Sequence, residues 1–302
     1  MEVRRGFDTP DSRLILALTD LERNRLIARF FSRPVLLDIA RRGSAAHVVE
    51  ELKKLGVDAG VSGASAADFF EASFDAVDSA YRCEYVYKTA IANRIVFGRH
   101  SPRTSSLHIE LPVAGSIVDA AVFNGVSTAY EIKTEYDSHR RLKTQTPAYL
   151  KAFERVFVVC HPSAAEYYAG VLDERVGVLS LNENNQLKEI RSSSADVSRI
   201  DPSVVFRMLR REEFIKAVQD KWGPQPEMSN GLIHSHYSHW FLQLSSEEAH
   251  RILVKAMKAR TTGADDVEFL SAVPKSLRAL ACATPLSRPQ RHKLLSALAL
   301  AA

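Results

Sequence analysis

Apolar residues change their spacing along this chain, and the changes divide it into segments of different secondary structure. Residues 10–58 and 66–96 place apolar side chains three and four positions apart, which is typical of amphipathic helices. Shorter runs rich in β-branched residues follow as far as residue 191, and helical spacing returns after Pro202. We expect a helical N-terminal region (1–74), an α/β core (75–195) and a helical C-terminal region (196–302).

The expected core contains three short strands before its second helix. The strands are SLHIELPV, SIVDAAVF and STAYEIKTE, with turns at Ala114-Gly115 and Asn124-Gly125. After them come a helix in RLKTQTPAYLKAFE, a buried strand in RVFVVCHP, a helix in SAAEYYAGVLDE and a hairpin in VGVLSLNENNQLKEIR. This order predicts an α/β fold built on a mixed sheet.

Three charged side chains fall at one end of the second and third strands. Side chains alternate along a strand, so Glu131 and Lys133 point to one face and Ile132 to the other. The Asn124-Gly125 turn can place Asp119 beside them. Two carboxylates and an ammonium group predict a site for a divalent cation. The alternative is an exposed strand face with a cross-strand ion pair.

The amino-acid composition is that of an ordinary globular protein, and by itself it favours no class of function strongly. The net charge of +4 and the pI near 8.9 favour a nucleic-acid partner only weakly. No apolar run could span a membrane and the N-terminus has no signal core, so we expect a cytoplasmic protein without a membrane partner. Arg140, Arg141 and Lys143 follow the predicted cation site and could contact phosphates, or simply form a solvated helix face.

The order of these residues resembles the PD-(D/E)xK nuclease superfamily, which has a restriction-endonuclease-like αβββαβ core. Eleven residues separate Asp119 from Glu131-Ile132-Lys133, and Gln145 and Tyr149 match the QxxxY motif of the RecB-like branch. The block EIKTEYDSHRRLKTQTPAYLKAFERVFVVCHP is also similar to a poorly characterised bacterial family of this superfamily. The resemblance covers roughly residues 80–195, and it departs from the usual motif by having Val118 where proline often stands.

The resemblance implies roles for the residues at these positions. Asp119 and Glu131 would bind Mg²⁺ together with the backbone carbonyl of Ile132, and Mn²⁺ could substitute. Lys133 would orient or deprotonate the attacking water, or stabilise charge on the scissile phosphate.

Two further positions have a structural alternative beside the implied role. Glu84 lies on the expected first core helix and would be a further metal ligand, or else a surface partner of Lys88. Gln145 and Tyr149 lie four apart and could reach the metal or a phosphate, but Tyr149 could also be a packed residue with a locally bonded hydroxyl.

The resemblance therefore implies a Mg²⁺-dependent nuclease that hydrolyses phosphodiester bonds in DNA. One alternative is a catalytically inactive protein that binds nucleic acid. Another is a nuclease of a phage-defence or repair system that is held inactive by its helical flanks. A homodimer is expected if the product is a double-strand break, because each strand needs an active site.

Overall fold

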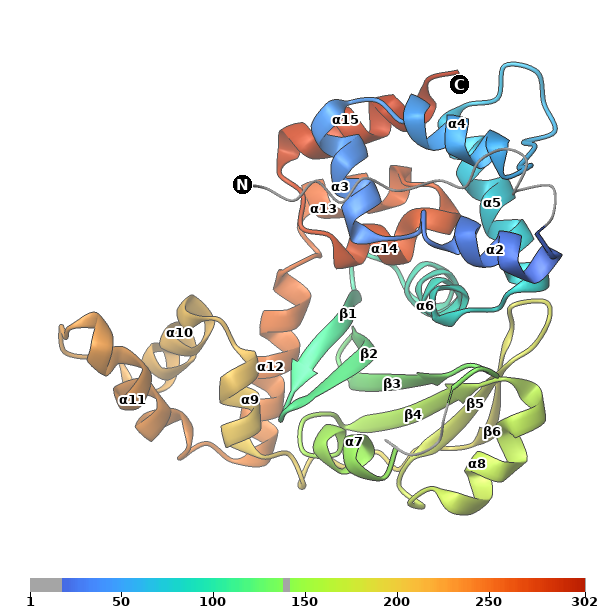
Figure 1. The fold of residues 1–302 in the computed structure, drawn as a ribbon. Coiled ribbons are helices and arrows are strands. Elements are labelled where there is room, and N and C mark those ends of the chain that lie inside the picture. Colours follow the sequence, from blue (N-terminus) through green and yellow to red (C-terminus); the bar gives the residue numbers. More distant parts are fainter. Residues whose placement is uncertain (1–17, 138–141, 302) are drawn as a thin grey trace, which may run out of the picture. The chain divides into compact units, whose positions relative to one another are not determined.

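The structure is a computed structural model that describes residues 18–137 and 142–301. It divides into two compact units (Figure 1), and each is described by itself. The first comprises the described parts of Met1–Thr89 and of Ala272–Ala302, and the second is made from Ala90–Ser271. The division differs from the three expected regions, because helices from both ends of the chain belong to one unit.

The first unit is helical. Its elements are α2 (Asp20–Ala28), α3 (Arg33–Arg42), α4 (Ala46–Lys54), α5 (Ala66–Ala80), α6 (Glu84–Ile91, which ends in the second unit), the 3₁₀ helix η4 (Lys275–Leu277), α14 (Arg278–Ala283) and α15 (Arg288–Ala299). The C-terminal α15 packs against α3 and α5, and α2 and α4 also pack on α5. Ser65 caps α5 through a reciprocal capping box with Asp68.

The second unit is built on a six-stranded mixed sheet. Its strands lie in chain order and are β1 (Ser106–Val113), β2 (Ser116–Phe123), β3 (Ser127–Lys133), β4 (Arg155–Cys160), β5 (Gly177–Leu181) and β6 (Leu187–Arg191). The first three strands are antiparallel, β3, β4 and β5 are parallel, and β6 is antiparallel to β5. The mixed α/β architecture expected from the sequence is therefore confirmed.

The second unit also contains helices, and some of them cover the sheet. They are the π-helix η1 (Ala92–Arg99), α7 (Leu142–Tyr149), the 3₁₀ helix η3 (Pro162–Ala164), α8 (Ala165–Val171), α9 (Pro202–Met208), α10 (Arg211–Trp222), α11 (Asn230–Phe241), α12 (Ser246–Ala259) and α13 (Ala264–Ala272, which ends in the first unit). One sheet face, represented by Ala129 and Val158, shares a core with Tyr149 of α7, Val205 of α9 and Leu253 of α12. On the figure, α9 and α12 lie side by side next to the β1–β2 hairpin (Figure 1).

Two helix predictions need correction. The helical spacing after Pro202 does not give one continuous helix over 203–222, because Leu209 has an extended backbone (ψ 146°) that separates α9 from α10. The helix predicted in RLKTQTPAYLKAFE ends earlier, at Tyr149, and Pro147 lies in its last turn. Within the described ranges, no helix combines the length and the apolar content that crossing a bilayer requires.

Candidate active site

The β2–β3 hairpin brings Asp119 and Glu131 together. Its ladder runs from Phe123–Ser127 to Ala120–Tyr130 and goes no further. Beyond that point the carboxylate of Asp119 takes the place of a strand carbonyl, and its Oδ2 accepts a hydrogen bond from the backbone N–H of Ile132 at 2.7 Å. Asp119 is half-buried, so its carboxylate lies near the surface at the end of the ladder.

Glu131 and Lys133 form an ion pair inside the protein. Their side chains point to the same face of β3, and Lys133 Nζ donates to Glu131 Oε1 at 2.7 Å. The two residues are 1% and 6% exposed, so the alternative of an exposed strand face is wrong. A buried charge requires a partner of opposite sign, and here each residue supplies it for the other.

Tyr149 closes the site from α7. Its hydroxyl lies 2.8 Å from Glu131 Oε2 and 2.6 Å from the carbonyl oxygen of Ile117. A hydroxyl has one proton, so Tyr149 donates to one acceptor at a time or shares the proton between them. Burial, and then the charge of Glu131, raise the pKa of Tyr149, which keeps the phenol neutral and a donor. Its bonds reach two strands, so they are not local to α7.

Gln145 lies one turn before Tyr149 on α7, as the predicted QxxxY spacing requires. Its Oε1 is buried, and no described residue donates a hydrogen bond to it. Buried polar atoms are nearly always hydrogen-bonded, so an acceptor without a donor is a place where a water or ligand can bind. Asp119, Glu131, Lys133, Gln145 and Tyr149 thus all belong to the second unit. Contacts join four of them directly or through a neighbouring backbone group, and Gln145 interacts with the Tyr149 hydroxyl through its side chain.

Of the other predicted site residues, the structure describes the surroundings of Glu84 only. Glu84 lies in α6 within the first unit and pairs with Lys88 at 2.6 Å, which is the structural alternative weighed for it. Its role as a metal ligand stays a prediction. Arg140 and Arg141 lie outside the described residues, and so does the side chain of Lys143.

The charge and the atoms of the site suit a small, hard cation. Asp119 and Glu131 carry two negative charges and Lys133 one positive charge, which leaves a formal charge of about −1. All their candidate ligand atoms are oxygens, as Mg²⁺ prefers. The described residues contain no group of three or more His, Cys, Asp or Glu side chains placed to hold a metal. An ion here would therefore depend on two carboxylates, a backbone carbonyl and oxygens from water or substrate.

The sequence analysis missed some contacts that shape this unit. The carbonyl of Ile117 anchors Tyr149, and no side-chain pattern could have indicated a backbone acceptor. His250 of α12 is buried and bonds Ser127 Oγ at 2.9 Å, at the opposite end of β3 from Lys133. The cations on the outer face of α12, considered below, were visible in the sequence as an i, i+4, i+7 spacing.

Comparison with known proteins defines the family. Residues 78–271, almost two thirds of the chain and all of the second unit, match the family described as bacteriophage P4 protein cII, and the chain belongs to this family. A curated relative, protein cII of Enterobacteria phage P4, is 31% identical over 108 residues, which are 35% of this chain. The match spans 40% of the length of that relative. No solved structure matches the chain.

Proposed function

We propose that this protein is a metal-dependent nuclease that hydrolyses phosphodiester bonds in DNA, with a restriction-endonuclease-like core. The observation that carries the proposal is the arrangement around Glu131, whose buried carboxylate lies between Lys133 and Tyr149 while Asp119 binds the next backbone amide. The helix, three strands, helix and strand from α6 to β4 follow the order αβββαβ. Fold likeness alone would not support an activity, so the proposal rests on the site residues.

The residues present fit a magnesium ion. Mg²⁺ is usually held by one or two carboxylates while substrate oxygens and waters complete its octahedron, and this site offers Asp119, Glu131 and the Ile132 carbonyl. When bound, the ion would polarise a phosphoryl oxygen and lower the pKa of a bound water. The unpartnered Oε1 of Gln145 offers a further acceptor for a water in the same region.

Lys133 and Tyr149 would have separate roles in the reaction. Lys133 is held by Glu131 and would place its positive charge beside the phosphate, where negative charge increases in the transition state. Tyr149 would fix the orientation of Glu131, because its hydroxyl binds the carboxylate oxygen that Lys133 does not. Such anchoring of a ligand side chain by a neighbouring donor is what gives a metal site its geometry.

The test is cleavage by purified protein of linear, circular and single-stranded DNA in Mg²⁺, Mn²⁺ or EDTA. We expect cleavage only with metal, and a loss of at least 100-fold in Asp119→Asn, because the half-buried Asp119 can lose its charge without breaking the buried pair. Asp137→Asn is the matched control. Its carboxylate accepts hydrogen bonds from the backbone N–H and the hydroxyl of Thr134, the residue after β3, and touches none of the site residues in any described contact.

Two results would contradict the proposal. The first is cleavage that persists in EDTA, and the second is equal activity in Asp119→Asn and the wild type. Circular dichroism and thermal unfolding of both variants would confirm that they are folded, so that a loss of activity reports on the site.

A second candidate is a protein that binds nucleic acid without cleaving it. It is favoured by the low exposure of Glu131 and Lys133, which leaves little of the pair open to a phosphate. The same incubations separate the candidates, because this one retains DNA in a binding assay and gives no product with either metal. Activity that appears only after limited proteolysis would instead indicate an inhibited nuclease.

A further inference from the structure

The outer face of α12 carries three cations that are separate from the candidate active site. Arg251, Lys255 and Lys258 follow one another at spacings of four and three residues, so they lie on one side of the helix. They line a hollow of about 410 Å³ together with Gly125 of the β2–β3 turn. No Asp or Glu is among the residues that line it. We call these three residues the α12 cation row.

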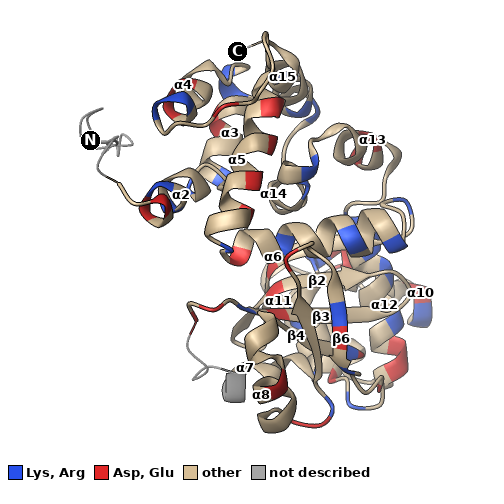
Figure 2. Ribbon diagram, turned by 90° about the vertical axis from the view of Figure 1, so that its right-hand side faces the viewer, with Lys and Arg blue, Asp and Glu red and all other residues tan. Residues whose placement is uncertain are grey.

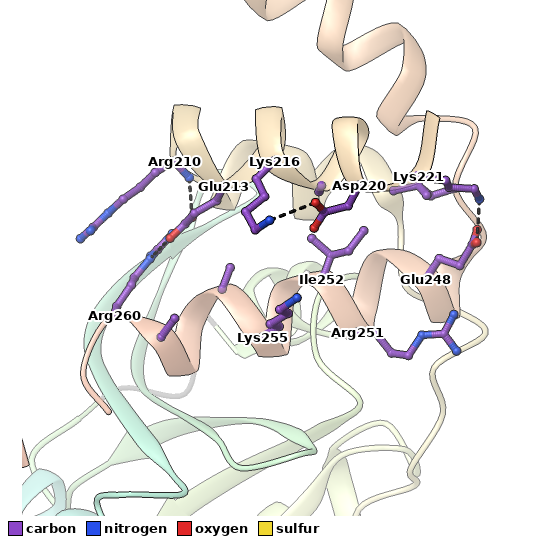
Figure 3. Close-up of a pocket in the computed structure, with 14 residues that line it drawn as sticks. Arg210, Glu213, Lys216, Asp220, Lys221, Glu248, Arg251, Ile252, Lys255 and Arg260 are labelled. Carbon is purple, nitrogen blue, oxygen red and sulfur yellow. Dashed lines mark hydrogen bonds and ion pairs between the residues drawn. The ribbon is translucent and has the colours of Figure 1, made fainter. Parts of the chain in front are cut away.

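On the neighbouring surface between α10 and α12, several cations form ion pairs. Lysines and arginines occur along both α10 and α12 (Figure 2), and three of those that line the groove between these helices form ion pairs. Figure 3 shows three ion pairs there, and they are Lys216–Asp220 at 3.0 Å, Lys221–Glu248 at 2.6 Å and Arg260–Glu213 at 2.5 Å. Arg251 points away from α10, and neither it nor Lys255 forms an ion pair with a described residue. Arg251 and Lys255, which also line this groove, thus lack among the described residues the close ionic partner that Lys216, Lys221 and Arg260 have.

Repulsion within the row costs stability unless something binds to it, and the attraction of Arg251 to Glu247 and Glu248 offsets only part of this cost. Like charges three or four residues apart destabilise a helix by about 0.2–0.5 kcal/mol per pair at low salt. Arg251 and Lys255 are exposed and Lys258 is half-buried, so solvent ions weaken the repulsion but supply no fixed partner. A ligand with a row of negative charges would relieve it.

The spacing of the row suits a nucleic-acid strand. Arg251 and Lys258 are seven residues apart, which is about 10 Å along a helix axis. One DNA strand carries a phosphate every 3.4 Å or so of axis, so about three phosphates cover the same length. The rest of the hollow is lined by small or polar groups that include Val254, Ala259 and Thr262. It lacks the large apolar floor that an amphipathic peptide would need.

The row lies away from Asp119 and Glu131. Gly125 belongs to the turn before β3, and Glu131 is four residues from the start of that strand at Ser127, or roughly 13 Å at the rise of an extended strand. Substitutions in the row should therefore leave the contacts of Glu131 unchanged. Because both regions belong to the second unit, a single nucleic acid could extend from one to the other.

We infer that the α12 cation row binds the sugar-phosphate backbone of duplex DNA. The inference rests on the proposed function for its choice of polyanion, but it requires only binding and holds without hydrolysis. Contacts of this kind position DNA and do not read its sequence.

The test is fluorescence anisotropy with a fluorescein-labelled 30-base-pair duplex, measured in EDTA over a series of NaCl concentrations. Removing two phosphate contacts in Arg251→Gln/Lys255→Gln should weaken binding at least tenfold at 50 mM salt. It should also lower the slope of log K against log salt by about 1.8, since each contact contributes about 0.9. Adding Lys258→Gln should bring the reduction to about 2.7.

The matched control is Lys216→Gln/Lys221→Gln, which removes two positive charges from the adjacent helix α10. We expect its affinity to stay within threefold of the wild type, because both lysines are already paired. Equal losses in the two double variants would overturn the inference, since they would show a general charge effect. Absence of binding by the wild type, or displacement of the duplex by poly-glutamate at equal charge concentration, would also overturn it.

The result can be separated from that of the nuclease test. Asp119→Asn should bind the duplex like the wild type, because it leaves the row intact. DNA binding that depends on the row, without any cleavage, would contradict the proposed nuclease activity and support this inference. Cleavage and DNA binding that are both unchanged in the row variants would support the nuclease proposal and contradict this inference.

Discussion

The second unit contains two groups of charged side chains, one buried and one exposed. At the end of the β2–β3 hairpin, Glu131 and Lys133 are buried and each neutralises the other. On α12, Arg251 and Lys255 are exposed and form no close ion pair with a described residue, although Glu247 and Glu248 attract Arg251 from the preceding turn. A buried charge depends on its partner for stability, whereas an exposed charge depends mainly on solvent. Substitutions should therefore have large effects on stability at the first region and small effects at the second.

The largest effect is expected from breaking the buried pair. Glu131→Leu leaves the ammonium group of Lys133 buried without its anion, and we expect it to lower the free energy of unfolding by about 3–5 kcal/mol. Glu131→Leu/Lys133→Met replaces both charges by apolar groups of similar size, and it should recover most of that loss. Urea unfolding at pH 7 measures both variants. A double variant as unstable as the single one would show that the pairing is not what stabilises these residues.

The next effect concerns a half-buried histidine that stays neutral. His108 of β1 lies 3.0 Å from the carbonyl of Met257 on α12, and burial lowers its pKa to about 4 from 6.5. Below pH 6.5 the unfolded chain binds this proton while the folded protein does not, so stability falls with decreasing pH until about pH 4. The loss from this group should total about 3 kcal/mol.

The substitution His108→Gln tests whether the low pKa of His108 causes this pH dependence of stability. The variant has no imidazole to protonate, so its unfolding free energy should change less between pH 6.5 and pH 4, by up to about 1.4 kcal/mol per pH unit. Urea unfolding at half-unit pH steps measures the difference. Parallel pH profiles for the wild type and the variant would show that His108 accepts a proton in the folded protein as easily as in the unfolded chain.

The sequence predicted the sheet better than the arrangement of the helices. The bounds of β1 and β2 match the expected strands, because Ala114-Gly115 and Asn124-Gly125 form the predicted turns and both glycines have positive φ. The helices gave no such boundary information. Apolar spacing shows which side of a helix is buried and not which helix covers it, so the packing of α15 on α3 was not predictable.

The candidate site was predicted in composition but not in detail. Alternation along a strand placed Glu131 and Lys133 on one face, and one hairpin turn brought Asp119 beside them. Strand alternation does not say whether that face is buried, and the burial of this pair depends on α7 and the helices after β6. The bond from Tyr149 to the Ile117 carbonyl depends on the approach of α7 to β2, which sequence spacing does not specify.

A smaller effect should follow the removal of the Tyr149 hydroxyl. Hydrogen bonds to charged groups contribute about 1.5–3 kcal/mol, and Tyr149→Phe removes the donor to Glu131 while keeping the ring. Urea unfolding should show a loss in that range. The same substitution in the Glu131→Leu background should cost less, because the charged acceptor is gone. Equal losses of stability in both backgrounds would show that the hydroxyl stabilises the protein through the Ile117 carbonyl and not through Glu131.

The smallest effect, and the one of opposite sign, is expected in the α12 cation row. Lys255 has Arg251 four residues before it and Lys258 three residues after it, so Lys255→Gln removes two repulsive pairs and should raise the free energy of unfolding by a few tenths of a kcal/mol at 10 mM salt. The gain should disappear in 1 M NaCl, where charges are screened within about 3 Å. Lys216→Gln, which removes a cation paired with Asp220, should instead cost a few tenths at low salt. If both variants lost stability equally, Lys255 would have an attractive partner in the folded protein, and the contrast between a paired α10 surface and an unpaired α12 row would be wrong.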